Sequence, residues 1–572
     1  MWQPIKCSKS GNHEAEAGPR RVPQGIWQPR RRIWAWAAVL LSLAAPAAAA
    51  ARDNPGKSQP GKTFRVTTRL VEVSVVAQTK DGSPARNLKA EDFRLYDDGE
   101  AQKIVFFNRE ALPRRRLPPQ VPPNVYTNRF EALGEDVAGV TVILFDGLNT
   151  PLVDQAYARQ QILKFLRELQ PGDRVALYVM GRGPRIIKDV SGDARALAAA
   201  LEHYKPEQRP SLDAPLYDPS FTPVAHFNAW LGELTFHLAD YFDRDRAFRT
   251  VRALTAIARH LQRLPGRKNL LWVSGSFPIS VAGSSIPLPE RLKRSASTGR
   301  WPETDRLMRA LNRANLAIYP VDARGLIAPR NYRADSPVVV ADDRLRDAQT
   351  FSVMRMIAAR TGGRAFYQNN DLAQAFRRAA DDVRATYTLG YYPSHDEWDG
   401  RFREIRVEVA RPDVKLLHRT GYFAQPDAPR EHWYREEVLK AAMFSPLEAS
   451  EVGLTVRVTP EKGVILLDLG IDASDVTFEP AGGKWKASLD LWMVQLDNKE
   501  RHLETDAQTT NLTLSQLDYE RVHRAGGLRL MGQVKPKKRA LLIKVMVRDV
   551  ASGALGSVII PVQPYRNRLK KR

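Results

Sequence analysis

Cysteine is almost missing from this sequence, because Cys7 is the only one among 572 residues. A single cysteine cannot form an intramolecular disulfide, so packing alone must stabilise the fold. The HExxH and GxSxG motifs of zinc proteases and serine hydrolases are also absent, and no two of the ten histidines have the i, i+4 spacing of a helical metal pair. The sequence therefore offers little support for enzymatic chemistry.

The chain also lacks an apolar run that is long enough for a confident transmembrane span. The candidate, from Ile33 to Ala45, is too short. Basic residues Arg30–Arg32 precede it and small residues from Pro46 to Ala51 follow it, which is the order of a secretory signal. We expect residues 1–51 to be removed as a signal peptide, together with Cys7, giving a secreted or periplasmic protein. An uncleaved membrane anchor is the alternative.

Acidic side chains are outnumbered by basic ones, and the formal net charge is +23. Seven basic and two acidic residues precede Arg52, so a net charge of +18 remains once a signal peptide is removed. Such a surface attracts polyanions, and an anionic polymer of the cell envelope is one expected partner. The arginines are scattered rather than gathered in a block. Frequent arginine use in a GC-rich genome therefore explains the charge as well, and no specific nucleic-acid site is predicted.

Residues 64–110 show the sequence pattern of β-strands. Valines alternate with polar residues over Val71–Val75, which is the period of a half-buried strand, and Asp-Gly turn dipeptides follow. We predict a small immunoglobulin-like β module over residues 64–110, preceded by a linker over 52–63. Five prolines and three consecutive arginines within residues 111–136 predict an extended, protease-sensitive linker.

The middle of the chain alternates between strand and helix patterns. An apolar, β-branched run from Val140 to Phe145 is typical of a strand that is buried on both faces. Strands and helices then alternate up to Tyr387–Tyr392, which is predicted to be the last strand of the same sheet. The pattern predicts an α/β fold with a doubly wound, mostly parallel sheet over residues 137–395. A β-hairpin extension over 396–425 and a C-terminal β-sandwich over 436–565 are predicted to follow.

The carboxyl end of the first buried strand carries the segment Asp146–Thr150. Ligands of open α/β sheets bind beyond the carboxyl ends of the strands, and carboxylate and hydroxyl oxygens can hold a divalent cation there. In the alternative interpretation, Asp146 caps its loop while Asn149 and Thr150 cap the following helix. The candidate metal ligands are Asp146, Asn149, Thr150 and Ser274, and the candidate binding face consists of Gly147, Leu148, Gly275, Ser276 and Asp322.

Several segments together resemble the von Willebrand factor A-type (vWA) fold and, more narrowly, the vWA-related domain family of acidobacterial secreted proteins. The resemblance covers Val66 to Ala424 and implies a vWA/Rossmann-like α/β domain with a metal-ion-dependent adhesion site. It rests on the order and spacing of Val71–Val75, Leu88–Phe93, Leu144–Thr150, Pro265–Gly275, Ile318–Gly325, Thr361–Gly363 and Tyr387–Pro393.

The adhesion site that the resemblance implies is degenerate in this chain. Its pattern in vWA domains is DxSxS, which Asp146 and Thr150 match at the first and last positions. Leu148 stands where an oxygen ligand belongs, and Ser274-Gly275 stands where an Asp-Gly pair is usual. Hard cations need several oxygen ligands, so we expect at most weak Mg²⁺ binding and no other cofactor.

These observations together predict an exported, non-enzymatic protein that binds another macromolecule, a protein of unknown identity, at the carboxyl-end face of its sheet. One alternative is a structural envelope component that holds anionic polymers by charge. A hydrolase built on the α/β sheet has less support, because no histidine is placed to serve as its base. Contact with a membrane is expected only through an uncleaved signal segment.

Overall fold

The computed structural model of the chain describes residues 70–109, 121–129, 139–181, 183–205, 245–264, 266–279, 307, 310–326, 341–395, 397–424, 432–461 and 463–566. The expected signal peptide and the linker over 52–63 lie outside the described residues. None of the helices within the described ranges combines the length and the apolar character that crossing a membrane requires.

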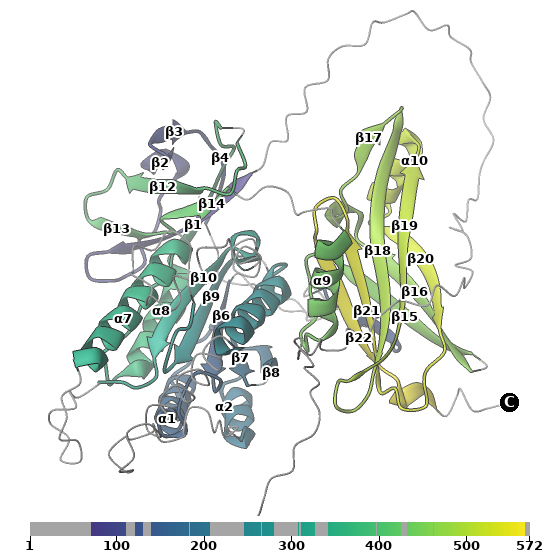
Figure 1. Cartoon of the computed structure of the whole chain (residues 1–572). Coiled ribbons are helices and arrows are strands. Elements are labelled where there is room, and N and C mark those ends of the chain that lie inside the picture. The colour runs from purple at the N-terminus through teal and green to yellow at the C-terminus, as the bar shows by residue number, and fades with distance from the viewer. Residues whose placement is uncertain are drawn as a thin grey trace, which may run out of the picture.

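One mixed sheet forms the centre of the α/β part (Figure 1). Its strand order is β10-β9-β6-β7-β8, in which β8 is antiparallel to β7 and the other neighbours are parallel. Strand β6 is buried along nearly its whole length, as its continuous apolar run predicts. The strands are β6 (Gly139–Asp146), β7 (Val175–Met180), β8 (Pro184–Ser191), β9 (Arg267–Ser274) and β10 (Leu316–Asp322).

Helices cover both faces of this sheet. On one face, the apolar sides of α1 (Leu152–Arg167), α2 (Ala194–His203) and α8 (Leu372–Arg384) pack on the strands. Helix α8 begins at an Asp371 cap, whose carboxylate accepts from Gln374 N–H, and it buries an apolar stripe at helical spacing. A helix over 245–261 and α7 (Ala341–Thr361) pack on the other face.

Two small antiparallel sheets, in the orders β13-β1-β11-β4 and β14-β12-β2-β3, flank the α/β part and share one apolar core. They are built from segments on both sides of the α/β region in the sequence. Their strands are β1 (Val71–Thr79), β2 (Phe93–Asp97), β3 (Glu100–Gln102), β4 (Ile104–Arg109), β11 (Thr386–Tyr391), β12 (Phe402–Val409), β13 (Val414–Leu417) and β14 (Gly421–Phe423).

Strand β11 differs from its prediction as the last strand of the central sheet. It pairs antiparallel with β1, where Val73 opposes Leu389, and with β4, where Phe107 opposes the same leucine. Its alternate residues Tyr387, Leu389 and Tyr391 are buried in the flanking core. The β module predicted over 64–110 is therefore completed by strands from far along the chain, which sequence periodicity cannot reveal.

The C-terminal part contains two antiparallel sheets that enclose a single apolar core. One has the order β20-β16-β15-β5, and the other has the order β17-β18-β21-β22 with β19 also paired to β18. The elements are β15 (Leu454–Glu461), β16 (Val464–Ile471), β17 (Glu479–Ala481), β18 (Lys484–Leu496), β19 (His502–Leu514), β20 (Leu528–Val534), β21 (Leu542–Asp549) and β22 (Leu555–Pro561), with helices α9 (His432–Met443) and α10 (Gln516–Arg524).

Part of the predicted proline-rich linker is built into this C-terminal part. Strand β5 (Val125–Thr127) pairs with β15. The buried Asn128 side chain donates to the carbonyl groups of Ala449 at 2.7 Å and Val452 at 2.9 Å, and it accepts from Leu454 N–H at 2.7 Å. The prediction of an extended linker is therefore wrong for residues 121–129, because one amide satisfies three backbone groups that composition does not disclose.

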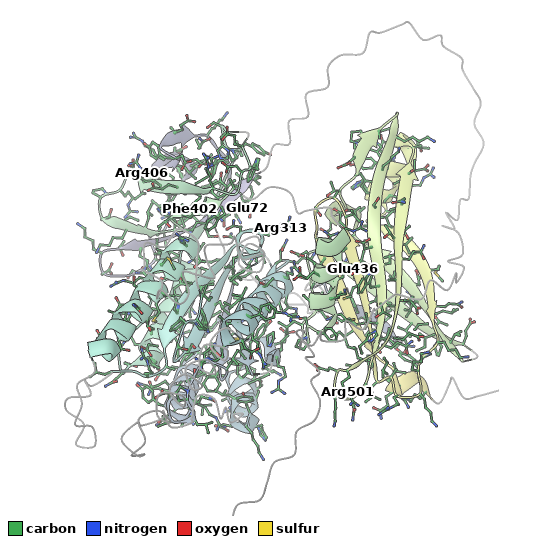
Figure 2. The ribbon with its side chains drawn as sticks, in the orientation of Figure 1. Glu72, Arg313, Phe402, Arg406, Glu436 and Arg501 are labelled. Atoms are coloured by element: carbon green, nitrogen blue, oxygen red, sulfur yellow. The ribbon has the colours of Figure 1, made fainter. Side chains whose placement is uncertain are left out.

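The α/β part contacts the C-terminal part through charged side chains and backbone groups. Arg263 donates to Asp472 at 3.1 Å. Arg313, which is labelled in Figure 2, donates to the carbonyl of Ser552 at 2.8 Å. Leu447 also joins the apolar core of the α/β part. These bonds fix the two parts to each other along one face of the central sheet.

Two ionisable side chains lie at this contact. Lys544 on β21 is fully buried, and its Nζ donates to the carbonyl oxygens of Ala442 at 2.8 Å and Leu447 at 3.4 Å. Glu448 is partly buried and accepts from Ile559 N–H at 2.6 Å. Because desolvation disfavours the charged form, burial raises the pKa of Glu448 to about 7 and lowers the pKa of Lys544 to about 8.

We predict that Glu448→Gln stabilises the protein at alkaline pH and not at acidic pH. The folded-state pKa of Glu448 is raised above its ordinary value of 4.5, so its contribution to stability is complete below that pH and is lost as the pH rises through about 7. Glutamine keeps an oxygen acceptor for Ile559 N–H. Denaturation at about pH 4 and about pH 8 should show equal stability at the lower pH and a gain at the higher one, with a slope change of at most about 1.4 kcal/mol per pH unit. An unchanged pH slope would contradict the assignment.

Candidate functional site

The strand order places the predicted site at the switch point of the central sheet. The chain leaves β6 toward β7 on one side and later returns to β9 on the other side. Crevices at such points, beyond the carboxyl ends of the strands, are where open α/β sheets bind ligands. Asp146 ends β6, Ser274 ends the neighbouring β9, and Asp322 ends β10. The structure therefore brings the strand-end residues to one edge, as the sequence predicts.

The Asp146 carboxylate lies at the centre of this edge and is completely buried. Its Oδ1 accepts from the backbone N–H groups of Leu148 and Asn149, each at 3.0 Å. Its Oδ2 accepts from Asn149 Nδ2, from Trp272 Nε1 and from the Ser274 hydroxyl, each at 2.9 Å. A carboxylate offers about four lone-pair positions, so the four N–H donors alone fill its capacity.

The other candidate ligands tie the loops to one another. Asn149 Nδ2 also donates to Thr250 Oγ1 at 2.9 Å, and Thr150 Oγ1 accepts from Gly275 N–H at 2.9 Å. Neither residue caps the following helix, since Pro151 occupies the cap position of α1 and makes no side-chain cap bond. The helix-capping alternative is therefore wrong for Asn149 and Thr150, although Asp146 does bind the backbone of its own loop.

The candidate binding face is not an open surface. Gly147, Leu148, Gly275 and Asp322 are buried, and Ser276 is partly buried. This burial differs from the prediction, because position at a strand end does not determine exposure. Leu148 is apolar and joins the core on one face of the sheet. The loops also approach closely: a Cβ on Gly275 would lie 3.2 Å from the carbonyl oxygen of Asn149.

Asp322 is held by a charged neighbour rather than left free for a ligand. Arg324 donates to Asp322 Oδ1 from Nε and to Oδ2 from a terminal nitrogen, each at 2.9 Å. The same guanidinium reaches Asp347 at 2.7 Å. The guanidinium group of Arg324 thus donates hydrogen bonds to both carboxylates. Asp322 therefore stabilises the turn that follows β10.

The electrostatics of Asp146 follow from its burial. Desolvation raises the pKa of its carboxyl group, and the hydrogen bonds from Asn149, Trp272 and Ser274 oppose that rise. The arrangement of these hydrogen bonds can hold the loops after β6 and β9 in place.

Trp272 and Thr250 belong to this site but were not predicted from the sequence. Trp272 is fully buried in β9 and packs edge-on against Phe277, with ring centroids 4.7 Å apart. A buried indole N–H needs an acceptor, and this requirement is the one signal that could have linked Trp272 to a buried carboxylate. Thr250 lies on the helix over 245–261, and nothing in the local sequence points to Asn149.

The donor set at this edge does not fit a resident Mg²⁺ ion. Direct ligation by Asp146 would displace buried N–H groups of Leu148 or Trp272, and a buried donor without an acceptor costs about 1–3 kcal/mol. The buried acceptors that lack a protein donor here are the neutral amide oxygens of Asn149 and Gln155. In the described ranges, no three His, Cys, Asp or Glu side chains are grouped as a metal site.

Three solved structures with a low level of similarity illustrate the comparison with known proteins. No protein family and no curated protein sequence matches the chain. A solved aerotolerance-related membrane protein from Bacteroides fragilis is 16% identical, covering 42% of this chain and 98% of its own, with a TM-score of 0.22. BatB from Bacteroides thetaiotaomicron is 12% identical over 43% and 96%, with a TM-score of 0.22. The ArnB paralog VWA2 from Sulfolobus acidocaldarius is 8% identical over 88% and 78%, with a TM-score of 0.20. These scores are too low to support an argument.

We predict that Asp146→Ala destabilises the α/β part by about 2–5 kcal/mol, because it leaves several buried donors without an acceptor. Trp272→Phe removes a single donor and should cost less. Val153→Ala changes a side chain that is 76% exposed and serves as the matched control, with an effect within about 0.5 kcal/mol. Calorimetric unfolding of the three variants measures the order of these losses. A melting temperature for Asp146→Ala equal to that of the control would rule out the structural role.

Proposed function

We propose that the chain is an exported, non-enzymatic interaction protein. In this proposal the α/β part is a vWA-type domain that binds a protein partner without a metal ion. One observation carries the proposal: protein donors already fill the acceptor capacity of Asp146, the first residue of the adhesion-site pattern. The residues of a cation site are thereby used to hold the loops at the carboxyl edge of the sheet.

The architecture supports the vWA-type assignment. Parallel strands β6, β7, β9 and β10 lie between helices on both faces, and a parallel bridge between Val321 and Phe366 extends the sheet beyond β10. Three segments that carry the sequence resemblance include the carboxyl ends of β6, β9 and β10. Within the described residues they cover Leu144–Thr150, Gly266–Gly275 and Ile318–Gly325.

Exposed apolar side chains beside the buried site support contact with a protein. Val153, in the first turn of α1, is 76% exposed, and Leu326, just after β10, is 61% exposed. Asn370 connects the two positions. Its Oδ1 accepts a hydrogen bond from Leu326 N–H, and its carbonyl oxygen accepts one from the Tyr157 hydroxyl, one helical turn after Val153. Exposed apolar side chains at this edge can contribute contact area to a protein interface.

The proposal is tested by capturing partners from envelope extract with the full chain, in Mg²⁺ and in excess EDTA. We expect the same partner in both conditions. The double variant Val153→Ser, Leu326→Ser should lose it. The matched control is Leu517→Ser, Met531→Ser, whose parent side chains are 60% and 47% exposed in the C-terminal part. Adding about 1 mM Mg²⁺ should barely move the melting temperature, since even a millimolar site contributes only about 0.4 kcal/mol.

Three outcomes would contradict the proposal. Loss of the partner in EDTA, or a large Mg²⁺-dependent stabilisation that Asp146→Ala abolishes, would restore a working metal site. Equal loss of the partner in the test and control variants would show that the carboxyl edge is not the contact surface.

A further inference from the structure

Two loops lie side by side at one end of the C-terminal part. The turn over 497–501 joins β18 to β19, and residues 535–541 join β20 to β21. The loops are adjacent because Leu541 N–H donates to the carbonyl of Leu496 at 2.8 Å. Arg501 marks this end in Figure 2, and α10 and β17 lie at the opposite end in Figure 1.

The first loop is fixed by Asp497. Its Oδ1 accepts from the backbone N–H groups of Lys499 at 2.8 Å and Arg501 at 3.0 Å, and its Oδ2 accepts from Arg501 Nε at 2.8 Å. The bonds from Arg501 lower the pKa of Asp497 to about 2, so the carboxylate stays charged across the physiological range. The turn therefore keeps one shape and leaves the Lys499 side chain exposed.

The second loop is fixed by the buried side chain of Gln495 on β18. Its Nε2 donates to the carbonyl of Lys535 at 3.1 Å, and its Oε1 accepts from Lys537 N–H at 2.7 Å. Arg566 donates to the carbonyl of Ala540 at 2.7 Å and holds the far side of the loop. The backbone that carries the basic side chains is thus ordered before any partner binds.

Basic residues outnumber acidic ones at this end, and only some of them are neutralised. Arg501 pairs with Asp497, and Lys537 pairs with Glu504 at 2.8 Å. The other acidic residues here are Glu500, Glu461 at the end of β15, and Asp506, which interacts electrostatically with Glu504 and Lys537. The exposed basic side chains without an acidic partner in the described part of the chain form the basic loop surface, defined as Lys499, Lys535, Lys538 and Arg539.

We propose that the basic loop surface binds a linear acidic polysaccharide of the cell envelope. Charge complementarity selects a polyanion, and two adjacent loops can contact successive carboxylates of one chain. None of the exposed large apolar side chains of the described residues belongs to these loops, whereas binding to a lipid surface gains strength from buried apolar area. The expected export of the protein favours an envelope polymer over nucleic acid. This surface is separate from the proposed protein contact at the sheet edge.

The binding should depend on salt, because the charges involved are exposed. If each basic side chain increases the affinity about two- to threefold, removing all four should lower the affinity by about thirtyfold. The probe is polygalacturonate, a linear uronate polymer, titrated against the full chain at about 50 mM and about 150 mM salt.

The test variant changes Lys499, Lys535, Lys538 and Arg539 to Gln. The matched control has the same change of charge at the opposite end of the same part, with Lys484, Lys486, Arg521 and Arg524 changed to Gln. We expect about thirtyfold weaker binding for the test variant and less than about threefold for the control. A milder double variant, Lys538→Gln, Arg539→Gln, should lose about fivefold, and it secures the test if the larger change impairs folding.

Three results would overturn the proposal. Equal loss of affinity in the test and control variants would mean that total charge, and not this surface, binds the polymer. Tighter binding to duplex DNA than to polygalacturonate at the same salt would assign the surface to nucleic acid. Binding to vesicles that contain phosphatidylglycerol, without binding to the polymer, would assign it to a lipid surface.

Discussion

A buried carboxylate needs hydrogen-bond donors from the protein because it is not in contact with solvent. The elements of the α/β part supply these donors to Asp146. The donors come from its own loop, from the neighbouring strand through Trp272 and Ser274, and from Asn149, which a helix residue holds in turn. The loops after β6 and β9 can approach closely because Gly275 has no side chain. The pairing of β6 with β9, the shape of the loops that follow them and the position of the helix over 245–261 therefore all depend on this one buried carboxylate. The exposed residues around the carboxylate are held in place as a result.

The same device recurs at the far end of the C-terminal part. Asp497 gathers the N–H groups of its turn, and Gln495 both donates to and accepts from the next loop. In each place a polar side chain forms hydrogen bonds with the backbone of a loop. The exposed side chains of that loop remain available to a partner. In the two proposals, an apolar edge on the α/β part and a basic surface on the C-terminal part bind different partners.

Sequence reasoning succeeded where burial is a local matter. The apolar run over Val140–Phe145 predicted a buried strand that ends at Asp146, and the polar strand ends met at one edge as expected. It failed where a distant segment decides the outcome. The partner of Tyr387–Tyr391 lies some three hundred residues away in β1, and the burial of Asn128 depends on carbonyl groups that only the folded C-terminal part presents. Periodicity reports which face is buried, but it does not report what covers that face.

The indole N–H of Trp272 reports directly on whether Asp146 serves the protein or a metal. Its resonance can be followed in the chain labelled with ¹⁵N-tryptophan and assigned by its loss in Trp272→Phe. If the carboxylate is a structural acceptor, this resonance stays in place, protected from exchange, when excess EDTA is replaced by about 10 mM Mg²⁺, because no ion competes for Oδ2. A shift of the resonance on adding Mg²⁺, with faster exchange of its proton, would mean that the ion takes the oxygen and that the site binds metal after all.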